Sequence, residues 1–184
     1  MRWKKVENRI LIWEIFSILF VLIVGSFLHF LFELSGYFYP VGAIAAVNES
    51  VWEHLKMGFW PIIFFSPIEF KFIKEKANNF IFAKMIAAYT VPASIVILFY
   101  SYTAILGTHL LIMDMLIFIL AIIIGHLFGY KIMISSEQPK IISKISLVLI
   151  IFLAFIFILF TYLPPRLPIF QDSLTGQYGI INHY

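Results

Sequence analysis

Residues 10–34 read ILIWEIFSILFVLIVGSFLHFLFEL, and this long apolar run decides the fold class. About 20 mostly apolar residues suffice for a helix to cross the hydrocarbon core of a bilayer. Further runs of this kind occupy residues 51–71, 80–106, 109–130 and 145–163. A secretory signal has an apolar core of only about 7–15 residues, so the first run is expected to stay as a helix. The sequence therefore predicts an all-α polytopic membrane bundle of about five transmembrane helices.

The composition agrees with this prediction. Of 184 residues, 62% are hydrophobic and 12% are charged, which excludes an ordinary water-soluble fold and a disordered chain. The absence of cysteine excludes disulfides and thiolate metal sites. We expect one integral membrane domain over residues 1–184, with residues 164–184 as an extracytoplasmic tail. Its first partner is the lipid bilayer, in a multi-pass arrangement in the cell (cytoplasmic) membrane.

The basic residues predict an orientation. With the N-terminus inside, eleven of the thirteen Lys and Arg residues, Lys84 among them, fall on the inner side. Only Lys56 and Arg166 fall outside, a bias that the positive-inside rule associates with an N-in, C-out topology. The net charge of +3 is then a sign of membrane anchoring, and no nucleic-acid partner is expected.

The acidic residues and histidines show a second asymmetry. The expected outer half holds only two bases but carries most of the imidazole and half of the acids. These residues are Glu33, Glu49, Glu53, Asp114, Asp172, His29, His54, His109 and His183. Membrane insertion does not require them, so any functional site is expected there.

His29 and Glu33 are four residues apart on the first predicted helix and therefore share one face. Ionisable groups within a membrane are costly unless they face the bundle interior and find partners. The pair thus indicates a buried polar site. The alternative is a His–Glu hydrogen bond that only orders the bundle.

The segment Asn48–Lys56 is the densest polar stretch in the chain. Ser50 and Glu53 match a capping box at a helix start, and Lys56 is interpreted as a snorkelling base. Glu49, Glu53 and Lys56 are expected on one stripe of the helix, with His54 turned about 100° away from Glu53. A neighbouring element would then have to complete any site.

The fourth predicted helix carries two histidines, His109 and His126, and one acid, Asp114. His109 and Asp114 are about 140° apart on a helix, so we expect them to face different directions. Asp114 is the better candidate for a buried site, whereas His109 is interpreted as a solvated loop residue. His126 lies towards the inner end and is interpreted as a packing residue.

Two histidines and a carboxylate favour Zn²⁺ or another divalent metal, with a position left open for water. Our hypothesis is a metal-assisted membrane hydrolase acting on a lipid or lipid-linked substrate. The candidate metal ligands are His29, Glu33, Glu49 and His54, and the candidate catalytic residues are Glu53, as general base, and Asp114. No HExxH motif, GxSxG motif or nucleotide fingerprint is present.

Two alternatives remain open. An acidic, imidazole-lined cavity could bind or transport a small solute, a cation or a proton. The same groups could instead serve assembly with a membrane-protein partner.

Three segments also carry a family resemblance. Together they resemble an uncharacterised family of small prokaryotic polytopic membrane proteins, defined as a domain of unknown function. The resemblance implies a membrane fold over nearly the whole chain and no particular activity. The segments are Gly25–Gly36, Val47–Lys56 and the tail from Pro164 to Ile180.

Overall fold

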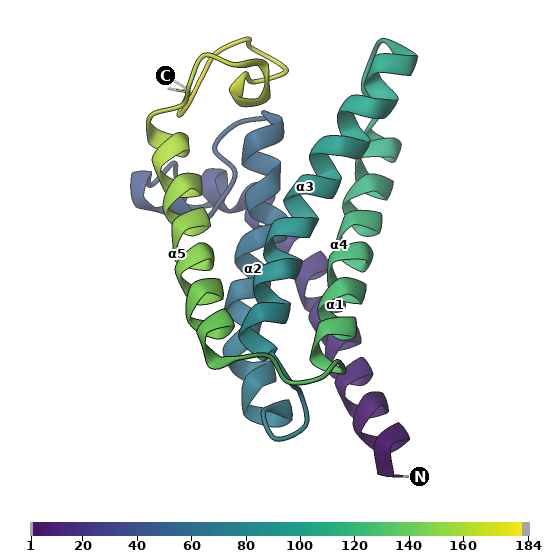
Figure 1. Ribbon diagram of the computed structural model, residues 1–184. Coiled ribbons are helices and arrows are strands. Elements are labelled where there is room, and N and C mark those ends of the chain that lie inside the picture. Colours follow the sequence, from purple (N-terminus) through teal and green to yellow (C-terminus); the bar gives the residue numbers. More distant parts are fainter. Residues whose placement is uncertain (1, 182–184) are drawn as a thin grey trace.

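The computed structural model describes residues 2–181, which form five long α-helices and no β-strand. The prediction of an all-α bundle is confirmed. In Figure 1 the helices run side by side, and the two ends of the chain lie at opposite ends of the bundle, called here its N-terminal and C-terminal ends. The helices are α1 (Arg2–Leu34), α2 (Val51–Ile73), α3 (Phe80–Leu106), α4 (Leu111–Met133) and α5 (Lys140–Tyr162).

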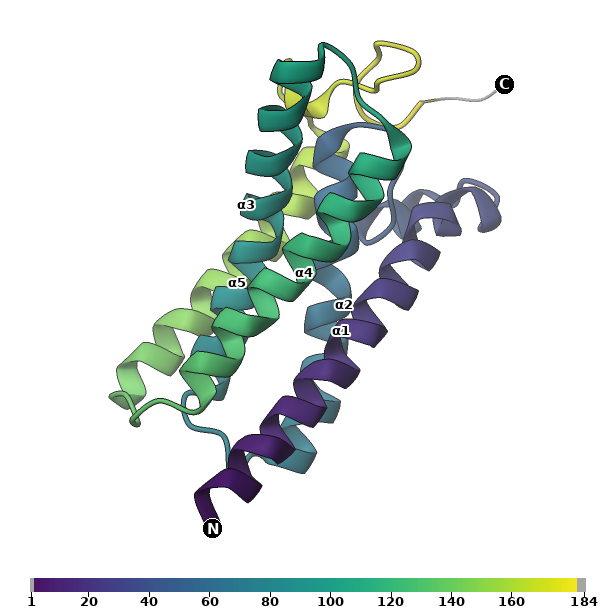
Figure 2. The same cartoon turned by 90° about the vertical axis from the view of Figure 1, so that its right-hand side faces the viewer.

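Helices α2 and α3 form the centre of the bundle. Helix α2 contacts α1 and α3, while α3 also contacts α4 and α5, and α1 contacts α4 (Figure 2). The largest group of buried apolar residues lies between these helices and includes Val21, Phe59, Ile62 and Val91. Any polar group on the inner faces of α1 to α4 is therefore shielded from solvent.

Four of the described helices are long and apolar enough to cross a membrane, namely Val6–Leu34, Phe80–Leu106, Leu111–Met133 and Lys140–Tyr162. Helix α2 is not among them, because it carries several charged residues along its length. Three of these, Glu53, Lys56 and Glu69, are buried in the bundle. The second of the five expected spans is thus a charged helix packed within a bundle whose other four helices are apolar.

The outer surface of the bundle is apolar. Ile23, Ile105 and Val148 are 71%, 83% and 63% exposed, and many other large aliphatic and aromatic side chains also point outwards. Exposed apolar surface on this scale is unfavourable in water and is expected of a surface that faces lipid.

Glycines allow the helices to approach closely. A Cβ atom on Gly125 of α4 would lie 2.5 Å from Cγ2 of Val91 on α3, and one on Gly129 would lie 3.4 Å from the carbonyl oxygen of Ala83. On the other side of the bundle, a Cβ atom on Gly25 would lie 2.6 Å from the carbonyl oxygen of Met57. These residues act as small-residue packing positions between helices.

Two irregular segments cover the C-terminal end of the bundle. The loop between α1 and α2 contains the 3₁₀ helix η1 (Tyr39–Ala43), and the tail after α5 contains η2 (Pro168–Phe170) and a single bridge between Gln171 and Tyr178. The backbone N–H of Ala46 donates to the carbonyl oxygen of Leu28, which fixes the loop against α1. These segments position the candidate site.

Candidate metal centre

His29, Glu49 and His54 come together at the C-terminal end of the bundle. Nε2 of His29 lies 3.7 Å from Oε1 of Glu49, and Nε2 of His54 lies 3.4 Å from Oε2 of Glu49. The two imidazole ring centres are 5.2 Å apart. One ligand atom from each residue lies within 4.8 Å of the other two, so the three side chains could hold one metal ion.

Each of the three residues comes from a different local structure. His29 lies near the end of α1, Glu49 lies in the loop, and His54 lies in the first turn of α2. Ser50 is the N-cap of α2, and its hydroxyl accepts a hydrogen bond from the N–H of Glu53. Because Glu49 precedes the helix, the expected stripe of Glu49, Glu53 and Lys56 was wrong. Glu49 can turn towards His54, while Glu53 and Lys56 point into the bundle.

The tail holds Glu49 in place. The backbone N–H of Glu49 donates to Oδ2 of Asp172 at 2.7 Å, and Nδ2 of Asn48 donates to the carbonyl oxygen of Gly179 at 2.8 Å. Oδ1 of Asp172 in turn accepts hydrogen bonds from Leu174 and from both the backbone and hydroxyl of Thr175. The sequence places Asp172 in the outer acidic set but does not show this supporting role. Its bond from the N–H of Leu174, two residues later, is an Asx turn, and the tendency of aspartate to form such turns is the only local signal of the role.

The hydrogen bonds of His54 determine which ring nitrogen carries its proton. Nδ1 of His54 lies 2.8 Å from the carbonyl oxygen of Ser50, which can only accept, so Nδ1 must be the donor. In neutral His54 the lone pair of Nε2 therefore faces a carboxylate oxygen of Glu49. Two acceptors at 3.4 Å repel each other unless a proton or a metal ion lies between them.

Electrostatics favours ionised carboxylates here. The pKa of Glu49 is lowered by its hydrogen bond with the protonated His54 ring and by the positive charge of both imidazoles when they are protonated, although partial burial and Asp172 oppose this. Burial also opposes ionisation of Asp172, but the hydrogen bonds from Glu49, Thr175 and Leu174 keep its pKa below the ordinary value. Both groups are thus negatively charged near neutral pH, as a cation site requires.

The geometry suits zinc. Two ligand atoms on a tetrahedral Zn²⁺ ion lie about 3.3 Å apart, because each bond is about 2.0–2.1 Å long. His29 and His54 lie 3.7 and 3.4 Å from different oxygens of Glu49, distances close to this value, and one ligand atom from each of the three residues lies within 4.8 Å of the other two. The Ser50 carbonyl fixes the His54 tautomer that leaves Nε2 free, a common arrangement around metal-binding histidines. Nδ1 of His29 is buried without a hydrogen-bond partner, so the described residues do not fix its tautomer.

The comparisons with known proteins give a family but no activity. A family model described as a family of unknown function, DUF6512, matches residues 1–180. The chain belongs to this family. This confirms the resemblance to an uncharacterised family. No curated protein and no solved structure matches the chain.

Glu33 lies apart from the cluster. It is exposed at the end of α1, and no ion pair or side-chain hydrogen bond of Glu33 is found among the described residues. The expected His29–Glu33 pair is thus not formed, because the loop folds back along α1 and brings Glu49 to His29 instead.

Glu53 and Lys56 form a buried ion pair inside the bundle. Nζ of Lys56 lies 2.6 Å from Oε2 of Glu53 and also donates to the carbonyl oxygen of Gly42 and to Oγ1 of Thr161. The Glu53 carboxylate also accepts hydrogen bonds from Thr161 and from the backbone of Val47. The interpretation of Lys56 as a snorkelling base was wrong. Since Glu53 is only 2% exposed and its oxygens are engaged, it is poorly placed to act as a general base.

Asp114 lies in the first turn of α4. The hydroxyl of Tyr102 donates to its Oδ1, and Nδ1 of His109 lies 3.2 Å from its Oδ2. His109 and Asp114 therefore do meet, contrary to expectation, because α4 begins at Leu111 and His109 precedes it. Asp114 is not part of the His29–Glu49–His54 cluster. His183 lies outside the described residues.

Proposed function

We propose that this membrane protein binds one divalent metal ion, with Zn²⁺ the best match, at His29, Glu49 and His54. The observation that carries the proposal is the pair of facing acceptors at His54 and Glu49. The Ser50 carbonyl keeps a proton on Nδ1, so in the neutral ring Nε2 and the carboxylate both offer lone pairs to the same space. A metal ion satisfies both without protonating the ring.

The open position on the metal suggests what such a site would do. The side chains of His29, His54 and Glu49 are 24%, 34% and 40% exposed, which leaves room for a water ligand. Zinc bound by three protein ligands lowers the pKa of its water to about 7 and so supplies a nucleophile. Metal-assisted hydrolysis is therefore the proposed reaction, in which the metal would activate a bound water and Glu53 would not act as general base.

The surroundings of the site favour a substrate from the bilayer. Phe27 and Phe30 of α1 are 52% and 55% exposed, and the ring of Phe30 packs edge-on against His29. A polar centre beside exposed aromatic side chains at the end of a membrane helix matches the interface between lipid and water. This supports a lipid or lipid-linked substrate with a hydrolysable bond at the level of the head groups.

Metal analysis tests the binding proposal. Protein is purified in detergent without chelators or a metal-affinity column, supplied with Zn²⁺, desalted and analysed by inductively coupled plasma mass spectrometry. We expect about one equivalent per chain, lost in His54→Ala and Glu49→Gln. Glu33→Gln is the matched control, since Glu33 lies on the same end of α1 but outside the cluster. Equal metal content in all three variants, or none in the wild type, overturns the proposal.

A reconstituted system separates hydrolysis from the alternatives. Proteoliposomes that contain a fluorescent phospholipid are assayed for released products with and without Zn²⁺, and the same vesicles are loaded with a zinc-sensitive dye. Product formation that requires His54 supports hydrolysis. Dye response without product formation indicates cation transport, and neither response in a metal-loaded protein indicates a role in assembly.

The N-in, C-out orientation and the cell-membrane location remain proposals. Leu174 in the tail is 79% exposed, and Glu137 lies exposed between α4 and α5. The chain has no cysteine, so single cysteines at these positions can be labelled selectively in whole cells. We expect an impermeant maleimide to label Leu174→Cys and not Glu137→Cys; the reverse pattern overturns the orientation.

A further inference from the structure

A second group of ionisable side chains is buried near the N-terminal end of the bundle. Glu14, Glu69, Lys84 and His126 come from α1, α2, α3 and α4 and are 2%, 0%, 2% and 1% exposed. Glu14 lies fifteen residues before His29, or about 22 Å along the helix at 1.5 Å per residue, so this cluster is separate from the candidate metal centre.

Lys84 is the centre of the cluster. Its Nζ atom lies 2.7 Å from Oε1 of Glu14 and 2.6 Å from Oε2 of Glu69. Both carboxylates therefore lie against the same ammonium group. The remaining neighbour is His126, whose Nε2 lies 3.9 Å from Oε2 of Glu14. The described part of α5 contributes no hydrogen bond or ion pair to the cluster.

The hydrogen bonds of His126 show that its ring can be neutral. Nδ1 lies 2.9 Å from the carbonyl oxygen of Ile122, which only accepts, so Nδ1 carries a proton. Nε2 lies 2.9 Å from the hydroxyl of Ser17, which can donate to it. A neutral imidazole is thus fully hydrogen-bonded and contributes no positive charge.

The charges of the cluster then do not balance. Two ionised glutamates and one ammonium leave a net charge of −1 among apolar helices. Oε2 of Glu14 and both carboxylate oxygens of Glu69 are buried and accept no hydrogen bond from any described residue, although Oε2 of Glu69 lies against the Lys84 ammonium. A buried charge without a partner costs several kcal/mol, and two carboxylates in one site relieve this by sharing a proton.

We propose that Glu14 and Glu69 together bind one exchangeable proton beside Lys84. The bound proton comes from water and converts one carboxylate into a carboxylic acid, whose O–H donates to the other carboxylate. The site then holds one acid, one carboxylate and one ammonium, and its net charge is zero. Release of the proton restores the charge of −1 within the bundle.

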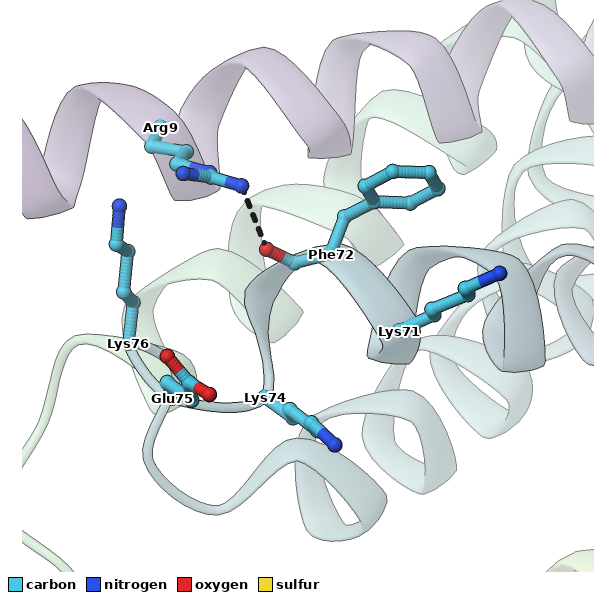
Figure 3. A pocket seen from close by; sticks show the side chains of 6 residues that line it. All are labelled: Arg9, Lys71, Phe72, Lys74, Glu75 and Lys76. Carbon is cyan, nitrogen blue, oxygen red and sulfur yellow. Dashed lines mark hydrogen bonds between the residues drawn. The ribbon is translucent and has the colours of Figure 1, made fainter.

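A solvent-open cavity lies close to this site. It has a volume of about 170 Å³ and is lined by Arg9, Phe72, Glu75 and three lysines, Lys71, Lys74 and Lys76. Figure 3 shows Arg9 of α1 reaching across to the end of α2, where it donates to the carbonyl oxygen of Phe72 at 3.0 Å. Arg9 is five residues from Glu14, about 7.5 Å along α1. The route from the cluster to water is therefore shorter through the N-terminal end of the bundle than through its C-terminal end.

Infrared difference spectroscopy tests the proposal directly. Protein in lipid nanodiscs is titrated from about pH 5 to about pH 9, and the carbonyl stretch of protonated carboxylic acids is followed. Labelling all glutamates with ¹³C at the side-chain carboxyl separates their band from that of aspartate. We expect a protonated glutamate band at neutral pH that disappears in Glu14→Gln and in Glu69→Gln.

Glu33→Gln is the matched control and should keep the band, because Glu33 is exposed. The amide in the other two variants is an uncharged stand-in for the protonated acid, so these variants are expected to fold as well as the wild type. If these variants do not fold, the protonated glutamate band of the ¹³C-labelled wild type still tests the proposal. Absence of a protonated glutamate at neutral pH overturns the proposal. Loss of the band on adding Na⁺ at constant pH also overturns it, because the ligand would then be a metal cation.

Discussion

Lys56 and Lys84 are both buried lysines paired with glutamate, but their surroundings differ. The ammonium of Lys56 has an acceptor for each of its three N–H bonds, namely Glu53, Gly42 and Thr161. That network contains one acid and one base. Lys84 has two acids around it, and three of the four carboxylate oxygens there accept no hydrogen bond from a described residue, although one of the three, Oε2 of Glu69, forms an ion pair with Lys84.

This difference separates a structural network from a binding site. A buried ion pair whose members are all hydrogen-bonded leaves no group free to take up another proton or ion. A buried cluster with more acids than bases is stabilised when it binds a cation from solvent, and the smallest such cation is a proton. Burial of charge alone thus does not indicate function, whereas unmatched charge and unfilled acceptors do.

Replacement of Lys84 should have the largest effect. Lys84 is the only described donor to either Glu14 or Glu69, so Lys84→Met leaves both carboxyl groups buried without a donor. We expect a loss of about 5 kcal/mol, at the upper end for a broken buried ion pair. The loss of stability is measured by thermal unfolding in detergent, with size-exclusion chromatography as the readout of folded protein. Lys144→Met, at an exposed lysine of α5, is the control, and equal stability of the two variants would contradict this prediction.

Replacement of Lys56 should cost less. In Lys56→Met the Glu53 carboxylate keeps hydrogen bonds from Val47 and Thr161, so we expect a loss of about 3 kcal/mol in the same assay. Adding Glu53→Gln removes the remaining charge and should restore part of the stability. A double variant that is less stable than Lys56→Met would show that the charge of Glu53 is not the cause.

Thr161→Val gives a smaller change in the balanced network. It removes an acceptor from Lys56 and a donor to Glu53 while keeping the shape of the side chain. We expect a loss of about 2 kcal/mol, since each buried polar group left without a partner costs about 1–3 kcal/mol. Ser146→Ala is the control, because Ser146 is buried too but donates only to Ile142 on its own helix. If both variants lose the same stability, the bridging role of Thr161 is not supported.

The membrane fold could be predicted from the sequence because it depends on run length and composition. The four apolar spans can be recognised in the sequence as long apolar runs, the first of which covers residues 10–34. The family can be recognised from the sequence as well. The burial of the charged residues of α2 was harder to predict. These residues are paired with groups that are distant in the sequence, as Lys56 is with Thr161. Lys84 was counted as an interfacial base for the same reason. Its partners Glu14 and Glu69 lie on other helices, and helical periodicity does not show which faces meet.

The candidate metal centre could be predicted only in part. His29 was predicted because it is an ionisable residue within an apolar run, and Glu49 and His54 because they lie in the densest polar stretch of the chain. Helical periodicity also predicted Glu33 as a ligand, because it considers only residues of the same helix. It predicted Glu49 to lie on a helix, but α2 begins two residues after Glu49. The turn that brings Glu49 to the histidines depends on Asp172, which is more than a hundred residues away.

Asp172 offers the mildest change and the clearest pH dependence. It holds the tail to the loop outside the apolar helices, so its loss should leave the buried networks intact. The folded-state pKa of Asp172 is below its ordinary value, so the stabilisation is present above about pH 4 and is lost as the pH falls through the folded-state value. Hydrogen exchange, corrected for the intrinsic effect of pH, should show the amides of Glu49 and Thr175 losing protection in that range.

Asp172→Asn should reproduce the acid effect at neutral pH. The neutral amide oxygen is a weaker acceptor, so Glu49 and Thr175 should exchange faster while global stability falls by less than about 1 kcal/mol. Asp114→Asn, in the first turn of α4, should leave these amides unchanged. Protection of Glu49 that survives both acid and Asp172→Asn would show that the loop holds its position without the tail. The candidate metal centre would then depend on α1 and α2 alone.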